Sequence, residues 1–282
     1  MASRRKKPRH PIGAHVPVAG GLVKKGVAEG DAIGAETIQI FAGSPRGWAP
    51  PRVDEDAALA FREACGERGW PVFVHAAYLI NLASPVPETV DRSVENLRAA
   101  MTASHLLGAE AVVVHAGSSI DGDRAGALKR LGPVYRRVLD GLPPMRLLVE
   151  PTAGAKNAMA STFQSTGEYL DAVGVDGVGL CLDTCHLHAA GEALADPERL
   201  DASLRALTAA IGPGRIGLVH FNDSKDARDS RRDRHEKLGD GVLGREGLGA
   251  VVATPLLQGV PLVIETPTRE HDVAYAKALE QR

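Results

Sequence analysis

The sequence has few cysteines, no long apolar run and little net charge. Its 282 residues include three cysteines, Cys65, Cys181 and Cys185, and these form no Cys-x-x-Cys pair. An odd number of scattered cysteines argues against a disulfide scaffold and favours a reducing compartment. No apolar run approaches the roughly 18 residues that a membrane span requires. The formal net charge of -2 leaves only local basic clusters for binding a polyanion.

The N-terminus is basic but lacks the features of a signal peptide. Its first ten residues, MASRRKKPRH, are followed by no continuous apolar segment. We expect residues 1–10 to form a disordered basic arm on a cytoplasmic protein. No low-complexity or Pro/Ser-rich linker divides the rest of the chain, so residues 11–282 should form a single domain, which we expect to be monomeric.

Eight short apolar runs rich in β-branched residues recur along the chain. They span residues 12–18, 37–41, 71–76, 111–117, 146–152, 178–184, 215–223 and 261–267. Most are separated by segments with helical spacing, among them residues 54–69, 87–108, 123–142 and 196–212. Strands that alternate with helices indicate parallel β-α-β units. Eight such units in one chain favour an α/β fold of the (β/α)8 TIM-barrel type over an open doubly wound sheet.

Six consecutive predicted strands end in a histidine, an aspartate or a glutamate. These residues are His75, His115, Glu150, Asp183, His220 and Glu265. A single histidine in such a position is more often a hydrogen-bonded rim residue than a ligand. In a parallel barrel, however, the C-terminal ends of the strands meet at one mouth. Six titratable groups would be costly to bury there unpaired, and a divalent cation is the simplest compensating charge.

The types of ligand restrict the metal and the number of ions. Imidazoles and carboxylates without a thiolate suit Zn²⁺, Mn²⁺ or Fe²⁺ better than Mg²⁺ or Ca²⁺. One zinc ion takes three or four ligands from the protein, so six residues predict two ions. Glu150, in the middle of the series, is the expected bridge between them.

Three further residues predict a third site. His186 follows Asp183 by three residues, so a helical turn or tight loop directs both to one cavity, while His188 should point away. Asp233 and His235, in the charged stretch DSRRDRHEKLGD, are separated by one residue, so an extended backbone presents both to one side. Alone, this stretch would be interpreted as a solvated loop. Beside a mouth that lacks positive charge, a metal site is the better interpretation.

Eight sequence blocks extend through nearly the whole chain. They are GAHVPVAGGL, QIFAGSPRGW, HAAYLINLASP, HAGS, VEPTAG, LCLDTCHLHAAG, HFNDSKDARDSRRDRHEKLGDG and VIETP. In this order they resemble the endonuclease IV family of apurinic/apyrimidinic (AP) endonucleases, and CLDTCH together with NDSK and DRHxxLGxG is the most specific part. The resemblance implies a zinc-dependent deoxyribonuclease IV of DNA base-excision repair, which acts on double-stranded DNA with abasic sites at the bacterial nucleoid.

The resemblance also implies a division of labour among the candidate residues. The first zinc ion would be held by His75, His115 and Glu150, the second by Glu150, Asp183, His220 and Glu265, and the third by His186, Asp233 and His235. Glu150 and Glu265 would be the catalytic carboxylates. Hydrolysis would occur 5′ to the abasic site and leave a 3′-hydroxyl and a 5′-deoxyribose phosphate.

The DNA contacts follow from the same resemblance. Arg46, Tyr78 and Leu79 match the residues that the family inserts into DNA, and their chemistry suits a wedge in the base stack. The expected phosphate contacts are Lys225, Arg228, Arg231, Arg232 and Lys237. The chain departs from the family at Pro151, where many members have asparagine, and in the loop SPRGW, which is Gln-rich in some members.

Two other interpretations stay open. A xylose-isomerase-like sugar isomerase or epimerase with one metal would need only Glu150, Asp183, His220 and Glu265, and would leave the other candidate ligands without a role. A noncatalytic DNA-damage binder would keep the fold without the metals, which the complete ligand set disfavours.

Overall fold

A closed barrel of parallel strands forms the centre of the molecule. The computed structural model describes residues 9–281. Its eight barrel strands run in the order β1-β10-β7-β6-β5-β4-β3-β2. They are β1 (Ile12–His15), β2 (Ile38–Phe41), β3 (Val72–His75), β4 (Ala111–His115), β5 (Arg146–Glu150), β6 (Val178–Asp183), β7 (Ile216–His220) and β10 (Leu262–Ile264). Each strand lies within one of the eight predicted runs, so the predicted TIM barrel is confirmed.

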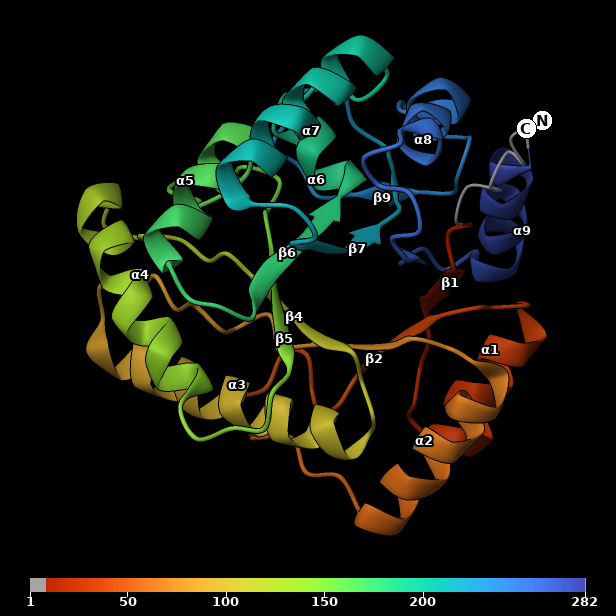
Figure 1. The fold of residues 1–282 in the computed structure, drawn as a ribbon, viewed down its shortest axis with the longest axis horizontal. Helices are drawn as coiled ribbons and strands as arrows, with labels where there is room; N and C mark the ends of the chain where they lie inside the picture. The colour runs from red at the N-terminus through yellow and green to blue at the C-terminus, as the bar shows by residue number, and fades with distance from the viewer. Residues whose placement is uncertain (1–8, 282) are drawn as a thin grey trace, which may run out of the picture.

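Helices surround the barrel (Figure 1). They are η1 (Leu22–Val27, a π-helix), α1 (Ala28–Ala32), α2 (Glu55–Arg68), α3 (Pro87–Leu106), α4 (Arg124–Leu139), α5 (Phe163–Val173), α6 (Thr184–Ala189), α7 (Pro197–Ile211), α8 (Gly244–Ala253) and α9 (Arg269–Glu280). Local sequence fixes their ends, as α2 illustrates. The side chain of Asp54 accepts a hydrogen bond from the backbone N–H of Ala57, and Gly69 ends the helix at a φ of 65°.

The hydrophobic core has an inner and an outer part. The inner part fills the barrel and consists of Phe73, Ala111, Val113, Leu148, Cys181, Leu218 and Val263. The outer part is larger and lies between the strands and the helices. All three cysteines are buried and free, and Sγ of Cys185 lies within 4.8 Å of potential ligand atoms of Asp233 and His235. Because side chains fill the barrel interior, polar groups can gather only at its ends.

The predicted basic arm lies largely outside the described residues. Its last two residues, Arg9 and His10, contact the body of the protein. Nδ1 of buried His10 lies 2.8 Å from the carbonyl oxygen of Val260. No helix within residues 9–281 is both long enough and apolar enough to cross a membrane.

A small hairpin follows β7 and was not predicted. Its strands β8 (Asp223–Ser224) and β9 (His235–Glu236) pair in an antiparallel manner. The charged stretch therefore begins in the loop between β8 and β9. Within it, His235 is the first residue of β9 and Asp233 lies two residues before that strand.

Candidate metal centre

Six strand-end residues point into the barrel mouth because they continue the inward-facing side of their strands. In each strand, the residue two positions earlier belongs to the inner core: Phe73, Val113, Leu148, Cys181, Leu218 and Val263. Side chains alternate across a strand, so the residue two positions later faces the same way. The residues placed there are His75, His115, Glu150, Asp183, His220 and Glu265.

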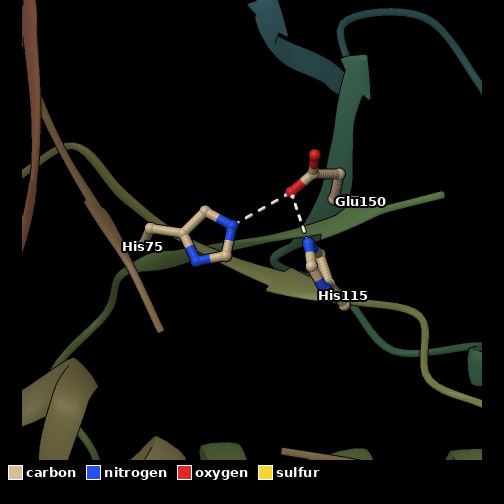
Figure 2. Close-up of side chains that lie close together, drawn as sticks. All are labelled: His75, His115 and Glu150. Carbon is tan, nitrogen blue, oxygen red and sulfur yellow. Dashed lines mark hydrogen bonds and ion pairs between the residues drawn. The ribbon is translucent and has the colours of Figure 1, made fainter. Parts of the chain in front are cut away.

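The first group consists of His75, His115 and Glu150, whose side chains converge from β3, β4 and β5 (Figure 2). Nε2 of His75 lies 3.1 Å, and Nε2 of His115 lies 3.4 Å, from Oε2 of Glu150. Nδ1 of His75 is 2.7 Å from the carbonyl oxygen of Ala76. A carbonyl oxygen only accepts hydrogen bonds, so Nδ1 carries the hydrogen and Nε2 presents its lone pair to the group.

The second group consists of Glu150, Asp183, His220 and Glu265, with one potential ligand atom of each within 4.8 Å of the others. Nδ1 of His220 lies 2.9 Å from Oε1 of Glu150 and 3.4 Å from Oε2 of Glu265. Glu150 belongs to both groups, with Oε2 toward the first and Oε1 toward the second. This is the arrangement expected of a bridging carboxylate.

Asp233 lies between the two histidines predicted to share a third site. Its carboxylate oxygens lie 3.1 Å from Nε2 of His186 and 3.0 Å from Nε2 of His235. The same two histidines also form a group with Asp183, which is the N-cap of α6. His188 is turned away, as expected, with Nε2 3.2 Å from the carbonyl oxygen of Asp226.

The electrostatics of the mouth fit divalent cations. Burial alone would raise the pKa of Glu150, but His220, His115 and His186 outweigh burial and hold this pKa well below its usual range. Likewise, burial opposes protonation of His186 and His220, yet the neighbouring acidic groups raise both pKa values well above normal. Without a metal, protons on imidazoles must balance the buried carboxylates. Cations can replace those protons.

A buried ring nitrogen of His235 that lacks a hydrogen-bond partner in the described part of the chain also supports a metal ion at this site. Nε2 of His235 is within ion-pair distance of Asp233, but it is not aligned for a hydrogen bond with any acceptor in residues 9–281. Burial of an unsatisfied polar atom is unfavourable, and a ligand that binds at this nitrogen would relieve the cost.

Two buried amides orient the ligands, and neither was predicted. Nε2 of Gln39 lies 2.9 Å from Oε1 of Glu265. Nδ2 of Asn222 lies 2.7 Å from Oδ2 of Asp183 and 3.1 Å from Oε2 of Glu265. A glutamine inside the apolar run TIQIF was the signal that the sequence offered for Gln39. No amide side chain is present at Pro151, but the carbonyl oxygen of this residue lies 3.0 Å from Nδ1 of His186 and orients that ring.

The residues expected to insert into DNA lie together at the rim. The backbone N–H of Tyr78 donates to the carbonyl oxygen of Pro45 at 2.9 Å, which places the exposed Arg46 loop beside Tyr78 and Leu79. Tyr78 and Leu79 are 45% and 38% exposed. The ring of Tyr78 stacks on His115, with 5.5 Å between the centroids. Burial and the nearby Glu265 raise the pKa of Tyr78 to about 12, so its hydroxyl stays neutral.

A pocket of about 420 Å³ lies beside this rim. Its lining includes Tyr78, Leu79, Thr152 and Lys156, together with the candidate ligand His115. The exposed Lys156 lies in the loop after β5, two residues beyond the block VEPTAG, and was not predicted as a site residue.

Three of the predicted phosphate contacts are paired with acidic residues of the segment from β8 to β9. The pairs are Lys225 with Glu236 at 3.9 Å, Arg231 with Asp229 at 3.7 Å, and Arg232 with Asp226 at 3.6 Å. Exposed pairs of this kind contribute at most about 1 kcal/mol. Phosphate oxygens can therefore replace the acidic partners at little cost.

Comparison with known proteins gives the family. The model of a family described as "Xylose isomerase-like TIM barrel" matches residues 27–281. A Streptomyces coelicolor protein named "Probable endonuclease 4" is 42% identical over 281 residues, which cover 96% of each chain. The chain belongs to the endonuclease 4 family. Its predicted membership is thus confirmed.

Solved structures agree with the assignment to endonuclease 4. The crystal structure of endonuclease IV from Thermus thermophilus superposes with a TM-score of 0.82 at 33% identity, over 96% of this chain and 97% of that one. A D-tagatose 3-epimerase-like protein superposes with a TM-score of 0.69 at 17% identity, over 96% of both chains. At that identity the likeness shows only a shared barrel.

Proposed function

We propose that this endonuclease 4 family member is a DNA repair endonuclease that hydrolyses the phosphodiester bond 5′ to abasic sites in double-stranded DNA. The observation that carries the proposal is the gathering of all the predicted ligands at one barrel mouth. These residues are His75, His115, Glu150, Asp183, His186, His220, Asp233, His235 and Glu265. A sugar isomerase with one metal would use only the second group, so the other two groups favour the nuclease.

The first group, the second group and the cluster of His186, Asp233 and His235 suit three zinc ions, with Mn²⁺ or Fe²⁺ as substitutes. His75 and His115 would complete the first site with Glu150, which would also bridge to the second site. His186 and His235 would complete the third with Asp233. When bound, such cations would neutralise charge on the phosphoryl group and make the attacking water more acidic.

The carboxylates of Glu150 and Glu265 would act as fixed negative charges that bind the cations. The pKa values of Glu150 and Glu265 are both lowered, because nearby histidines outweigh the effect of burial. Both groups are therefore ionised at neutral pH and do not act as proton donors. Gln39 and Asn222 hold Glu265 through its two oxygens, so its orientation is set before the substrate binds.

Hydrolysis of the phosphodiester consumes one water molecule and breaks one bond to phosphorus. Water adds to phosphorus, and the bond from phosphorus to the 3′ oxygen of the preceding nucleotide breaks. The leaving oxygen keeps the electron pair and takes up a proton. The products are a 3′-hydroxyl and a 5′-deoxyribose phosphate.

The rim residues supply recognition of the abasic site. An abasic nucleotide has lost its stacking, so its extrusion from the helix costs less than that of an intact nucleotide. Tyr78 and Leu79 offer an aromatic and an aliphatic surface to the gap, and Arg46 offers a planar cation. Around the rim, Lys225, Arg231 and Arg232 would exchange their acidic partners for phosphates.

A synthetic duplex with one tetrahydrofuran abasic analogue tests the proposal. We expect incision immediately 5′ to the analogue, with a 3′-hydroxyl end that a polymerase extends, and no incision of the matched intact duplex. Incision should stop after chelation and return when Zn²⁺ is added. Binding without incision would identify a damage binder instead. Absence of both binding and incision would favour the isomerase interpretation.

A further inference from the structure

Gln39 lies at the centre of a hydrogen-bond network behind the second group. This side chain is fully buried on β2 and neighbours His15 in the barrel register. Its Nε2 lies 2.9 Å from Oε1 of Glu265 and 3.0 Å from Nδ1 of His15. Its Oε1 lies 2.9 Å from Nε2 of His220. One amide therefore contacts two predicted ligands at once.

The chemistry of these contacts determines where the ring hydrogen of His220 lies. An ionised carboxylate only accepts hydrogen bonds, so the amide atom that faces Glu265 must be the NH2 group of Gln39. The amide oxygen then faces His220. Because this oxygen also only accepts, Nε2 of His220 must carry the hydrogen. In a neutral imidazole the lone pair is then on Nδ1, the atom that faces Glu150 and Glu265.

His220 thus differs from the histidines held by backbone carbonyls. In His75 and His186, Nδ1 faces the carbonyl oxygens of Ala76 and Pro151, so each ring presents Nε2 to its group. At His220 a side-chain amide from another strand performs this task, and it selects the opposite nitrogen. The selection depends on Gln39 and not on the course of the backbone.

We propose that Gln39 is a positioning residue that fixes His220 in the Nε2-protonated tautomer, so that Nδ1 is its metal ligand, and that holds one oxygen of Glu265 so that the other faces the same ion. The inference rests on the proposed metal centre. Partners that orient metal ligands in this way typically change metal affinity by about 10- to 100-fold when they are removed.

Gln39→Met tests the role of the amide, because methionine keeps a similar length and volume but makes neither hydrogen bond. The matched control is Gln258→Met, the same change at a half-buried glutamine in the connection from α8 to β10. Equilibrium dialysis against Zn²⁺ should show one equivalent bound about 10- to 100-fold more weakly in Gln39→Met. We expect no change in Gln258→Met. Circular dichroism would check that both variants are folded.

The tautomer itself is visible by NMR. Long-range ¹H–¹⁵N spectra of the zinc-loaded, ¹⁵N-labelled protein should show the hydrogen of His220 on Nε2, and this pattern should be lost in Gln39→Met. A hydrogen on Nδ1 of His220 in the unsubstituted protein would overturn the inference. Identical zinc binding in the two glutamine variants would overturn it as well. If the unsubstituted protein bound no zinc, the proposed metal centre would fail first, and the inference with it.

Discussion

The candidate ligands on the barrel strands and those on the charged loop are held in different ways. Glu150, Asp183 and His220 are the last residues of barrel strands and are at most 1% exposed. The side chains of Asp233 and His235 are 52% and 19% exposed; Asp233 lies on the loop between β8 and β9, and His235 is the first residue of β9. Backbone hydrogen bonds between the barrel strands hold the strand ligands in place, whereas the positions of Asp233 and His235 depend on a few polar contacts that hold the loop.

A buried carboxylate is the main anchor of that loop. The side chain of Asp223, at the start of the hairpin, accepts hydrogen bonds of 2.8 to 3.2 Å from backbone N–H groups on both sides of the loop: those of Ser224, Gly239, Gly241, Leu243 and Gly244. Asp272 on α9 adds a contact at 3.2 Å to the N–H of Leu238. The loop sites therefore rest on a few polar contacts, and substitutions should separate the two sets of ligands.

The largest effect is expected at the strand residue shared by two groups. Glu150→Gln replaces the bridging carboxylate by a neutral amide, which is a poor metal ligand. We expect incision of the abasic duplex to fall by about a thousandfold or more, the equivalent of several kcal/mol of lost charge stabilisation. Glu168→Gln, the same change at an exposed residue of α5, should incise normally. Substantial incision by Glu150→Gln would refute the bridging role.

A smaller and more local loss is expected at the loop ligand Asp233. Asp233→Asn should lower bound zinc by one equivalent and turnover by about a hundredfold, while the strand groups keep their metal. The control is Asp229→Asn, an exposed aspartate of the same loop that pairs with Arg231 at 3.7 Å. Metal analysis and incision rates measure both effects. Loss of all the zinc from Asp233→Asn would show that the two sets of ligands are not independent.

Removal of the loop anchor should weaken the loop site without touching a ligand. In Asp223→Asn an NH2 group would face the backbone donors, and N–H groups would be left without acceptors. We expect a loss of about 1–3 kcal/mol in the free energy of unfolding by urea, together with weaker binding of one zinc ion. Asp240→Asn, at an exposed aspartate paired with Lys237, should match the unsubstituted protein. Normal binding of all the zinc by Asp223→Asn would rule out the anchoring role.

The pH dependence of stability should differ between metal-free and zinc-loaded protein. The folded-state pKa values of His186 and His220 are raised above the ordinary value of 6.5. Their protonation therefore stabilises the metal-free fold fully below about pH 6.5, and this contribution is lost as the pH rises through the raised values. Zinc replaces those protons, so the stabilisation by zinc should grow over the same range. Thermal melts across this range, with and without chelator, would show diverging midpoints; parallel curves would contradict the assignment.

The smallest effect is expected for the basic side chains on the outside of the loop. Arg231→Ala should weaken DNA binding modestly and reduce the slope of log affinity against log salt by about 1, as expected for one lost phosphate contact. Arg205→Ala on α7, whose guanidinium is also exposed, provides the control. An unchanged salt slope for Arg231→Ala would remove Arg231 from the DNA interface.

Features that depend on the periodicity of the sequence could be predicted from it. Features that depend on tertiary contacts could not. The barrel and the six inward residues follow from apolar runs and the alternation of side chains along strands. The pairing of Asp233 with His235 follows from their spacing. By contrast, Gln39 and Asn222 act through partners far away in the chain, and Asp223 acts through backbone N–H groups that the folding of the loop brings to it. The acidic partners of the loop arginines were also missed, because charge pairing depends on how the loop folds back.

The metal content of the purified protein tests the central claim most directly. Three zinc equivalents per chain, bound by the strand ligands and the loop ligands together, are the predicted result. One equivalent per chain would contradict the account, because the second group alone would then be occupied, as in a single-metal isomerase.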